Sequence, residues 1–306
     1  MSAIAGARPP RPRPSRAARK QTWVAWGFAA PFIILFLVFM AGPIVASLVM
    51  SFTDLTTRDL QSPFNVNFVG FENYLRLFDD PRFLRSLTNT GVFVIVGVPL
   101  TIAVALLVAL ALNTGITRFR TVFRVGYYAP VVTSIVAIAI VWKFILQPDG
   151  LLNGFLGWFG INGPNWLEDT FWALPSLILM AIWRNIGTLM VIFLAGLQGV
   201  PREHHEAAMV DGASAFQRFT NVTLPALRPT VLFAAVITGI GFLQFFEEPF
   251  VMTRGGPLDA TLSSAMYTFN QFGFGNYSYA SAASYVLFLA IVVLSLVQFR
   301  LLKRED

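Results

Sequence analysis

The chain has 306 residues, of which 56% are hydrophobic and 12% are charged, and it carries a formal net charge of +6. Its apolar residues form long blocks without the period-two alternation of a membrane β-barrel, so the composition predicts an all-α membrane protein and excludes a barrel. The sequence contains no cysteine, which excludes a disulfide framework and a thiolate metal or redox site.

Six apolar blocks are the expected transmembrane helices, because a helix needs about 20 apolar residues to cross roughly 30 Å of hydrocarbon. The blocks cover residues 23–52, 91–112, 125–146, 171–197, 230–251 and 279–302. Four prolines within them are expected to bend or break the spans: Pro31, Pro43, Pro130 and Pro175.

The positive charge is unevenly distributed along the chain. It gathers in a Pro/Arg-rich tail over residues 1–21, between the second and third spans, in the segment 199–229 and after the last span. Basic residues favour the cytoplasmic side of a membrane, so both termini are expected in the cytoplasm, and the charge does not indicate a nucleic-acid partner. The first block exceeds the ~7–15 apolar residues of a signal peptide and is expected to remain as an anchor.

Three segments are left on the outer side. Residues 68–90 combine a helical apolar stripe with a helix start at Asp80-Pro81, and we expect short surface helices there. Residues 147–169 are interrupted by glycines and are expected to run along the surface without spanning. The third segment, residues 253–277, contains a turn at Gly255-Gly256-Pro257.

A polar insert between the fourth and fifth spans is the most informative segment. Pro201 is expected at the first helical position, and a short helix then runs to Asp211, after which Gly212 suits a left-handed C-terminal cap. Ser214 can cap a second short helix, and Leu224-Pro225 is expected to end the segment. A simple chain reversal needs about 2–8 residues, so an ordered knob that docks into a partner is favoured over a solvated loop.

The insert contains a specific motif. Glu206-Ala207-Ala208 is followed after three residues by Gly212, and after nine more by Val222-Thr223-Leu224-Pro225. This spacing resembles the Glu-Ala-Ala loop of binding-protein-dependent ABC importer permeases, with valine in place of the commoner isoleucine. The stretch NYLRLFDDPRFLRSLTNT, the Ala195-Gly196-Leu197-Gln198 approach and VMTRGGP resemble the carbohydrate-uptake branch, the maltose-permease type. The resemblance covers nearly the whole chain.

The resemblance implies the membrane fold of that family over residues 22–306 and a role as the permease subunit of an ATP-driven importer of a sugar or sugar derivative. The implied partners are a second, homologous permease, two ATPase subunits and an extracytoplasmic solute-binding protein, all at a bacterial inner membrane. ATP and Mg²⁺ are expected on the ATPase, because this chain lacks a GxxxxGK[ST] phosphate-binding loop and is not expected to be an enzyme. The outer turn at Gly255, Gly256 and Pro257 is expected to face the binding protein.

The resemblance also implies that the insert docks into a groove of the ATPase. The residues expected to carry this coupling match the motif or lie on the knob: Glu206, Ala207, Ala208, Asp211, Gly212, Ala213, Phe216, Leu224 and Pro225. A zinc site at His204-His205-Glu206 is not expected, since Met209 occupies the position that a second histidine would need.

Polar residues inside apolar spans are costly and indicate function. The candidate pathway residues offer charges, an amide and an aromatic face to the hydroxyls and the CH face of a sugar: Arg184, Gln244, Phe245, Glu247 and Glu248. The open alternatives are structural pairing of Arg184, acids that snorkel at the interface and a lipid-facing phenylalanine. Along ideal helices, Arg184 lies too deep to pair with either glutamate unless a helix tilts or breaks.

A secondary transporter driven by an ion gradient is the alternative function, but carboxylates near mid-membrane and paired repeats are not evident. An intramembrane enzyme would need a nucleophile with a base, or a metal site, and the sequence offers neither. The sequence does not identify the sugar, because pockets for different sugars differ by a few polar side chains.

Overall fold

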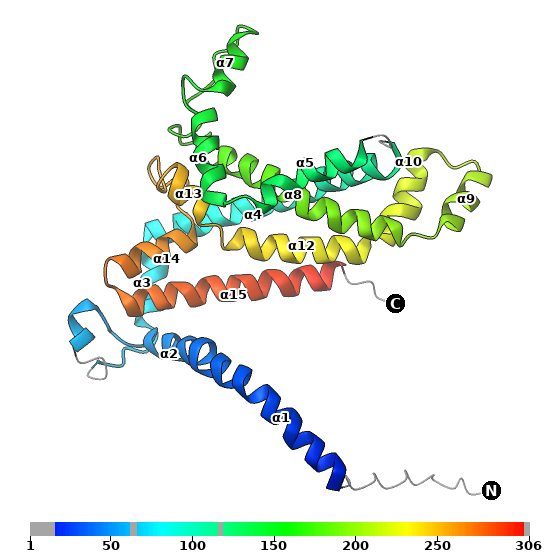
Figure 1. The fold of residues 1–306 in the computed structure, drawn as a ribbon. Helices are drawn as coiled ribbons and strands as arrows, with labels where there is room; N and C mark the ends of the chain where they lie inside the picture. The colour runs from blue at the N-terminus through cyan, green and yellow to red at the C-terminus, as the bar shows by residue number, and fades with distance from the viewer. Residues whose placement is uncertain (1–15, 62–65, 116–118, 303–306) are drawn as a thin grey trace, which may run out of the picture. The chain divides into compact units, whose positions relative to one another are not determined.

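We describe a computed structural model of the chain in which residues 16–61, 66–115 and 119–302 are placed (Figure 1). Contacts divide the chain into two compact units, Met1–Met50 and Ser51–Asp306, which are taken in turn. Most of the expected basic tail, up to residue 15, lies outside the described residues.

The first unit is one apolar helical run. α1 (Arg16–Phe36) continues through a π-helical turn, η1 (Leu37–Ala41), into α2 (Gly42–Met50). The part from Val24 to Met50 has the length and hydropathy of a membrane span, as the sequence predicts. Pro31 leaves α1 continuous and the π-helical turn precedes Pro43, so these prolines modify the helix without ending it.

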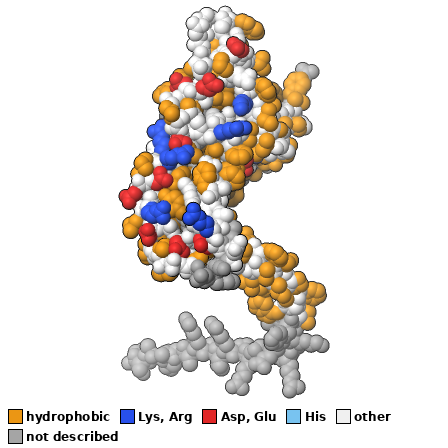
Figure 2. Space-filling view, turned by 90° about the vertical axis from the view of Figure 1, so that its left-hand side faces the viewer, with side chains coloured by type: hydrophobic (Ala, Val, Ile, Leu, Met, Phe, Trp, Pro, Cys, Tyr) orange, Lys and Arg blue, Asp and Glu red, His pale blue; other side chains and the backbone are white. Residues whose placement is uncertain are grey.

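The second unit is also built from helices. Their bounds are η2 (Thr57–Gln61), α3 (Glu72–Asp79), α4 (Pro81–Leu110), η3 (Ala111–Gly115), α5 (Arg120–Val132), α6 (Ile135–Ile145), α7 (Leu151–Gly157), α8 (Ala173–Gln198), α9 (Arg202–Val210), α10 (Ala215–Arg218), η4 (Phe219–Thr223), α11 (Leu224–Ala226), α12 (Arg228–Leu243), α13 (Glu247–Met252), α14 (Ser264–Gly273) and α15 (Tyr277–Leu302). α4 packs along α8, and α12 lies against α4 and α15 (Figure 1). Basic and acidic side chains mingle on the face of this unit seen in Figure 2.

Four helices among the described residues are long and apolar enough to cross a membrane, and two bent pairs raise the number to as many as six. The four are Val24–Met50, Pro81–Asn113, Ala173–Gln198 and Tyr277–Arg300. α5 meets α6 at 102°, and the run Ala215–Ala226 meets α12 at 66°. The predicted six spans are therefore present when each bent pair counts as one.

Two of the predicted spans are discontinuous, and the break in the third follows Pro130, where the sequence predicts a bend or break. In the third, Pro130 removes a helical N–H donor near the end of α5, and the backbone leaves the helical region at Thr133 and Ser134. In the fifth, α12 ends at Leu243, and α13 starts only after the non-helical residues 244–246. Hydrophobic length predicts a crossing but not whether the crossing is continuous.

The start of α4 also differs from expectation. Asp80 caps it through a 2.8 Å bond accepted from the Arg82 N–H, with Pro81 at its first position, as predicted. The helix is not a short surface element, however, because it runs unbroken from Pro81 into the span. Pro175 was expected to bend a span, but it sits in the first turn of α8, where N–H groups have no intrahelical partner to lose.

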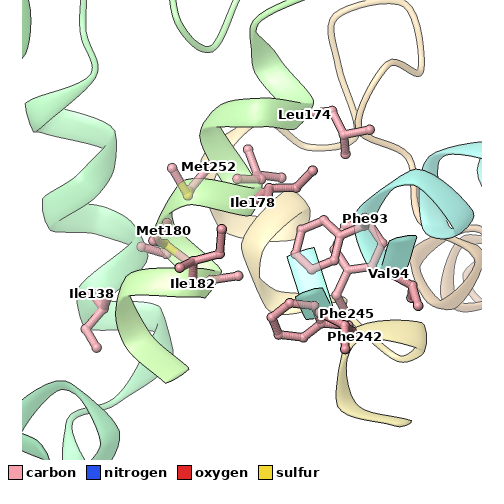
Figure 3. Packing of buried hydrophobic residues seen from close by; sticks show 14 of the residues in the cluster. Phe93, Val94, Ile138, Leu174, Ile178, Met180, Ile182, Phe242, Phe245 and Met252 are labelled. Atoms are coloured by element: carbon pink, nitrogen blue, oxygen red, sulfur yellow. The ribbon is translucent and has the colours of Figure 1, made fainter. Parts of the chain in front are cut away.

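The largest hydrophobic cluster joins α4, α6, α8, α12 and α13 (Figure 3). The rings of Phe93 and Phe245 stack at 3.9 Å, and Phe242 meets Phe93 edge-on at 5.1 Å. Gly97 on α4 faces the Phe242 ring so closely that an added Cβ would lie 2.7 Å from it. Aromatic packing of this density fixes α12 and the residues after it against α4.

Gly187 sets the approach of α5 to α8, because a Cβ there would collide with the carbonyl oxygen of Tyr127. Backbone atoms cannot rotate away, so Gly187→Ala should destabilise the protein by about 1–3 kcal/mol, measured as a lower Tm of the purified protein. In the control Gly91→Ala, the new Cβ on α4 meets nothing within 4 Å. Gly91→Ala should leave the Tm unchanged or raise it, since alanine favours a helix more than glycine does. Equal Tm values for both variants would contradict the close approach.

Candidate functional site

The polar insert folds into a compact unit, which we call the knob, residues 201–218. α9 begins at Arg202, so Pro201 is its N-cap residue rather than its first helical residue. α9 closes in a Schellman motif: the Gly212 N–H donates to the Met209 carbonyl at 3.1 Å, and the Ala213 N–H to the Ala208 carbonyl at 2.9 Å. Gly212 has φ +76°, the left-handed conformation that the sequence predicts.

The second half of the knob is capped as firmly. The Ser214 hydroxyl accepts from the Gln217 N–H at 3.3 Å, and the Gln217 side chain accepts from the Ser214 N–H at 2.8 Å. This reciprocal capping box satisfies two backbone donors at the start of α10. Local hydrogen bonds therefore order the turn between α9 and α10 on both sides.

Apolar side chains project from the knob without protein cover. Val210 is 88% exposed, Phe216 75% and Met209 50%, whereas Phe219 packs into the protein core. Glu206 and Ala207 are also exposed, and Ala208 and Ala213 are partly covered. Exposed apolar groups on an ordered polar element mark a surface for protein interaction.

The chain leaves the knob differently from expectation. Leu224-Pro225 does not end the segment, because α10, η4 and α11 follow one another without a break and the direction changes only at Leu227. Pro225 lies just after a π-helical turn, an arrangement that alters the local hydrogen bonding of a helix. Leu227 is fully buried, so the bend itself is packed into the core.

Two charged residues lie on neighbouring helices at the broken fifth span. Arg184 on α8 is partly buried, Glu248 on α13 is buried, and the two helices contact each other. Among the described residues, Arg184 Nε and Glu248 Oε2 are buried atoms that lack a hydrogen-bond partner. The two side chains are not an ion pair within 4.0 Å, so each has unused hydrogen-bonding capacity.

The other candidate pathway residues separate into two groups. Gln244 and Glu247 are exposed, and Gln244 lines a cavity of about 430 Å³ with Thr268 and Ser284. Phe245 is 3% exposed, and its ring stacks on Phe93 (Figure 3). The expectation that Phe245 offers an open face to a sugar is therefore corrected, because that face packs in the core.

The loop at Gly255-Gly256-Pro257, which is expected to face the binding protein, exposes a different residue from the three expected. Left-handed backbone occurs at Arg254, Gly255, Leu258 and Asp259, and the Gly256–Pro257 bond is cis. Gly255 is buried, and Gly256 and Pro257 are partly covered. Leu258 is 89% exposed, the highest value among the large hydrophobic side chains of the described residues. Sequence reasoning missed it, although an apolar residue next to a Gly-Gly-Pro turn was a readable signal.

The loop is held in place from α4. Arg82 makes a bidentate ion pair with Asp259, with N–O distances of 2.8 and 2.9 Å. The Asn89 side chain donates to the carbonyls of Asp259 and Leu262 at 2.8 and 3.0 Å. The Arg82 guanidinium donates both hydrogen bonds, and the Asp259 carboxylate accepts them. These contacts present Leu258 in one fixed position.

A cluster of phenols and a carboxylate lies beside the loop. The second oxygen of Asp80 accepts from the hydroxyl of Tyr267, which is buried and also contacts the Tyr279 hydroxyl at 3.3 Å. Burial and the hydrogen bond to Asp80 raise the pKa of Tyr267. No pattern along the chain indicates this cluster, because Asp80 lies far from Tyr267 and Tyr279 in the sequence.

Comparison with known proteins identifies relatives. Residues 80–304 match the family described as binding-protein-dependent transport system inner membrane component. The chain is 40% identical over 280 residues to the lactose transport system permease protein LacF of Rhizobium radiobacter, covering 90% of this chain and 92% of the relative. It is 34% identical to the arabinooligosaccharides transport system permease protein AraP of Bacillus subtilis, covering 90% of this chain and 87% of the relative.

The fold is also similar to a solved structure. A chain of the bacterial alginate ABC transporter, in complex with an alginate pentasaccharide-bound periplasmic protein, aligns with a TM-score of 0.77 at 26% identity. The match covers 93% of this chain and 96% of that chain. The similarity in fold therefore extends over nearly the whole chain.

The Tyr267 cluster predicts a pH dependence. Because the folded-state pKa of Tyr267 is raised, its stabilisation is complete below about pH 10, where the unfolded phenol ionises, and declines as the pH rises further. The wild-type Tm should fall as the pH rises above about 10. Tyr267→Phe, which cannot ionise, should have a lower Tm at neutral pH and should lose less of it over the same pH range. Tyr277→Phe, outside the cluster, serves as the control. Identical pH profiles for Tyr267→Phe and the wild type would contradict this interpretation.

Proposed function

Because this chain belongs to the binding-protein-dependent transport system inner membrane components, we propose that it is the permease subunit of an ATP-driven importer of a sugar or sugar derivative. It would form half of the translocation pathway beside a second, homologous permease. Membership in a family of transport permeases favours an ABC importer over an ion-gradient-driven transporter. The names of LacF and AraP, which refer to lactose and arabinooligosaccharides, support a carbohydrate substrate.

The structure of the knob is the main support for a role in coupling to an ATPase. Its caps hold α9 and α10 in one geometry, and its exposed Val210 and Phe216 offer apolar contacts to a groove. The proposed partner is a cytoplasmic ATPase, present in two copies and carrying ATP and Mg²⁺, because this chain has no phosphate-binding loop of its own. The proposed contact residues are those of the motif and knob: Glu206, Ala207, Ala208, Asp211, Gly212, Ala213, Phe216, Leu224 and Pro225.

The knob is connected to the long helices by short segments on both sides. On one side α9 follows α8 after only three residues, and on the other a helical run from Ala215 reaches Ala226 before α12. α8 and α12 both pack against α4. Movement of the docked knob would therefore reorient the helices that carry Arg184 and lead to Glu248. This geometry suits a transporter in which an external motor opens and closes the pathway.

The proposed pathway and outer contacts follow from the same orientation. Arg184 and Glu248, with Gln244 and Glu247 nearby, are the proposed groups for substrate hydroxyls. The outer loop with Gly255, Gly256 and Pro257 would face the solute-binding protein, with Leu258 as its projecting contact. The proposed location is a bacterial inner membrane with both termini in the cytoplasm, a basic tail over residues 1–21, a permease domain over residues 22–306 and the coupling loop at 199–229.

Co-purification tests the partner assignment. Glu206 is exposed on α9, so Glu206→Lys reverses a charge at the proposed interface without disturbing the core. The ATPase subunit should co-purify with the wild type and be lost from Glu206→Lys. Glu168→Lys, a change outside the knob, should retain it. Gradient-driven uptake by this chain alone, without an ATPase, would overturn the proposed function.

Gly212 tests whether the geometry of the knob transmits the movement. No atom lies within 4 Å of a Cβ built there, so a substitution acts through the backbone at φ +76° and not through a clash. Gly212→Val places a β-branched residue in a conformation that it rarely adopts, and should abolish binding-protein-dependent uptake. Gly212→Asn tolerates this conformation and should retain most uptake. Uptake and ATP hydrolysis are measured in proteoliposomes, and equal activity of the two variants would contradict the role.

A further inference from the structure

A second polar cavity lies apart from both the knob and the intramembrane polar site. It has a volume of about 450 Å³ and opens between α3, the start of α15 and the turn that follows α14. The face of these outer segments carries mixed basic and acidic side chains (Figure 2). A cavity of this size can hold a small organic ligand.

The walls of the cavity are rigid. The Asn73 side chain donates to the carbonyls of Ser51 and Thr53 at 3.0 and 2.8 Å, which fixes α3 to the preceding segment. The Ser278 N–H donates to the Leu55 carbonyl at 3.1 Å, which fixes that segment to α15. Gly275, at φ +80°, lies so close to Thr57 that any Cβ would collide with its side chain. The cavity is therefore formed before any ligand arrives.

Two of the carboxylates that line the cavity already accept hydrogen bonds from other groups of the protein. The oxygens of Asp54 accept from the Asn67 N–H at 2.8 Å and from the Asn67 side-chain amide at 2.9 Å, and these bonds lower its pKa. The oxygens of Asp80 accept from the Arg82 N–H and the Tyr267 hydroxyl. Neither carboxylate is left as the main group for a ligand.

The carboxylate of Glu72 and the guanidinium of Arg76 also line the cavity and do not form an ion pair with each other. Glu72 and Arg76 are one helical turn apart on α3, a spacing at which such side chains commonly pair. Among the described residues, the only ion pair within 4.0 Å is Arg82–Asp259, so Glu72 and Arg76 stand apart. The Arg76 guanidinium lies over the Tyr279 ring, 5.4 Å from its centroid. The cavity thus presents a free acceptor next to a free donor.

The opposite wall repeats this pattern with neutral groups. The Asn276 amide donates to the Gln271 carbonyl oxygen at 2.8 Å, which orients both side chains. This bond leaves the amide hydrogens of Gln271 and the carbonyl oxygen of Asn276 for a ligand. The cavity lining therefore offers both donors and acceptors to a ligand.

We propose that this cavity is an outer binding site for one unit of a neutral sugar. The two groups left for a ligand, Glu72 and Arg76, are an acceptor and a donor of opposite charge, which suits a ligand whose neighbouring groups both donate and accept. A sugar hydroxyl both donates and accepts, and two adjacent hydroxyls can bridge the carboxylate and the guanidinium. The site on the outer side would hold substrate before it enters the membrane, and this placement rests on the proposed function.

Direct binding to the full chain in lipid nanodiscs tests the site without ATP or a partner protein. The probes are lactose, maltose, cellobiose and arabinobiose. Their binding is measured by isothermal titration calorimetry and by saturation-transfer NMR. At least one of these sugars should bind to the wild type. Glu72→Gln and Arg76→Gln should each weaken its binding by about tenfold or more, because each change removes a charge-assisted hydrogen bond. The matched controls Asp79→Asn and Arg85→Gln alter exposed charges outside the cavity and should bind like the wild type.

Three results would overturn the proposal. They are binding of none of the four sugars, equal binding by Glu72→Gln, Arg76→Gln and the wild type, and preference for argininamide or glucuronate over every neutral sugar. Gly212→Val should bind sugar like the wild type, because it acts on the knob alone. Loss of uptake in Gly212→Val with intact sugar binding separates this site from the coupling function.

Discussion

Hydrocarbon offers no hydrogen-bond partners to a peptide backbone, and the architecture of this chain follows from that constraint. A span must be helical unless protein or a water-filled cavity covers the exceptions. The two exceptions here, residues 133–134 and 244–246, lead into α6 and α13, which pack against each other. Phe245 at the second break is buried, whereas Thr133, Ser134 and Gln244 are exposed on the surface of this chain.

After the break, α13 carries Glu248 into a buried position on a helix that contacts α8, the helix of Arg184. Breaking a helix exposes backbone groups, and burying an acid that is incompletely hydrogen-bonded adds a further cost. Such costs persist in proteins where function requires them. The aromatic stack of Phe93 and Phe245 supplies the packing that holds the broken segment in place. A hydrophobic contact thereby positions a polar site.

The two ends of the second unit are organised in different ways. The knob is held by local caps and leaves apolar side chains free, which suits an element that must dock and move as one body. The outer segments are joined by contacts between distant parts of the chain, such as Arg82 with Asp259 and Asn73 with the segment before it. Those contacts produce fixed concave and projecting surfaces, which suit recognition.

The sequence by itself determined the membrane class, the number of crossings and the knob, because each depends on local physics. Hydrophobic length predicts a span, Gly212 supplies a left-handed backbone, and Ser214 with Gln217 satisfies the N–H groups that start α10. Only the tertiary structure decided that Phe245 is core, that Leu258 projects and that Glu72 and Arg76 share a cavity. These outcomes depend on which distant segments touch, and a side chain's neighbours across space leave no periodic signal along the chain.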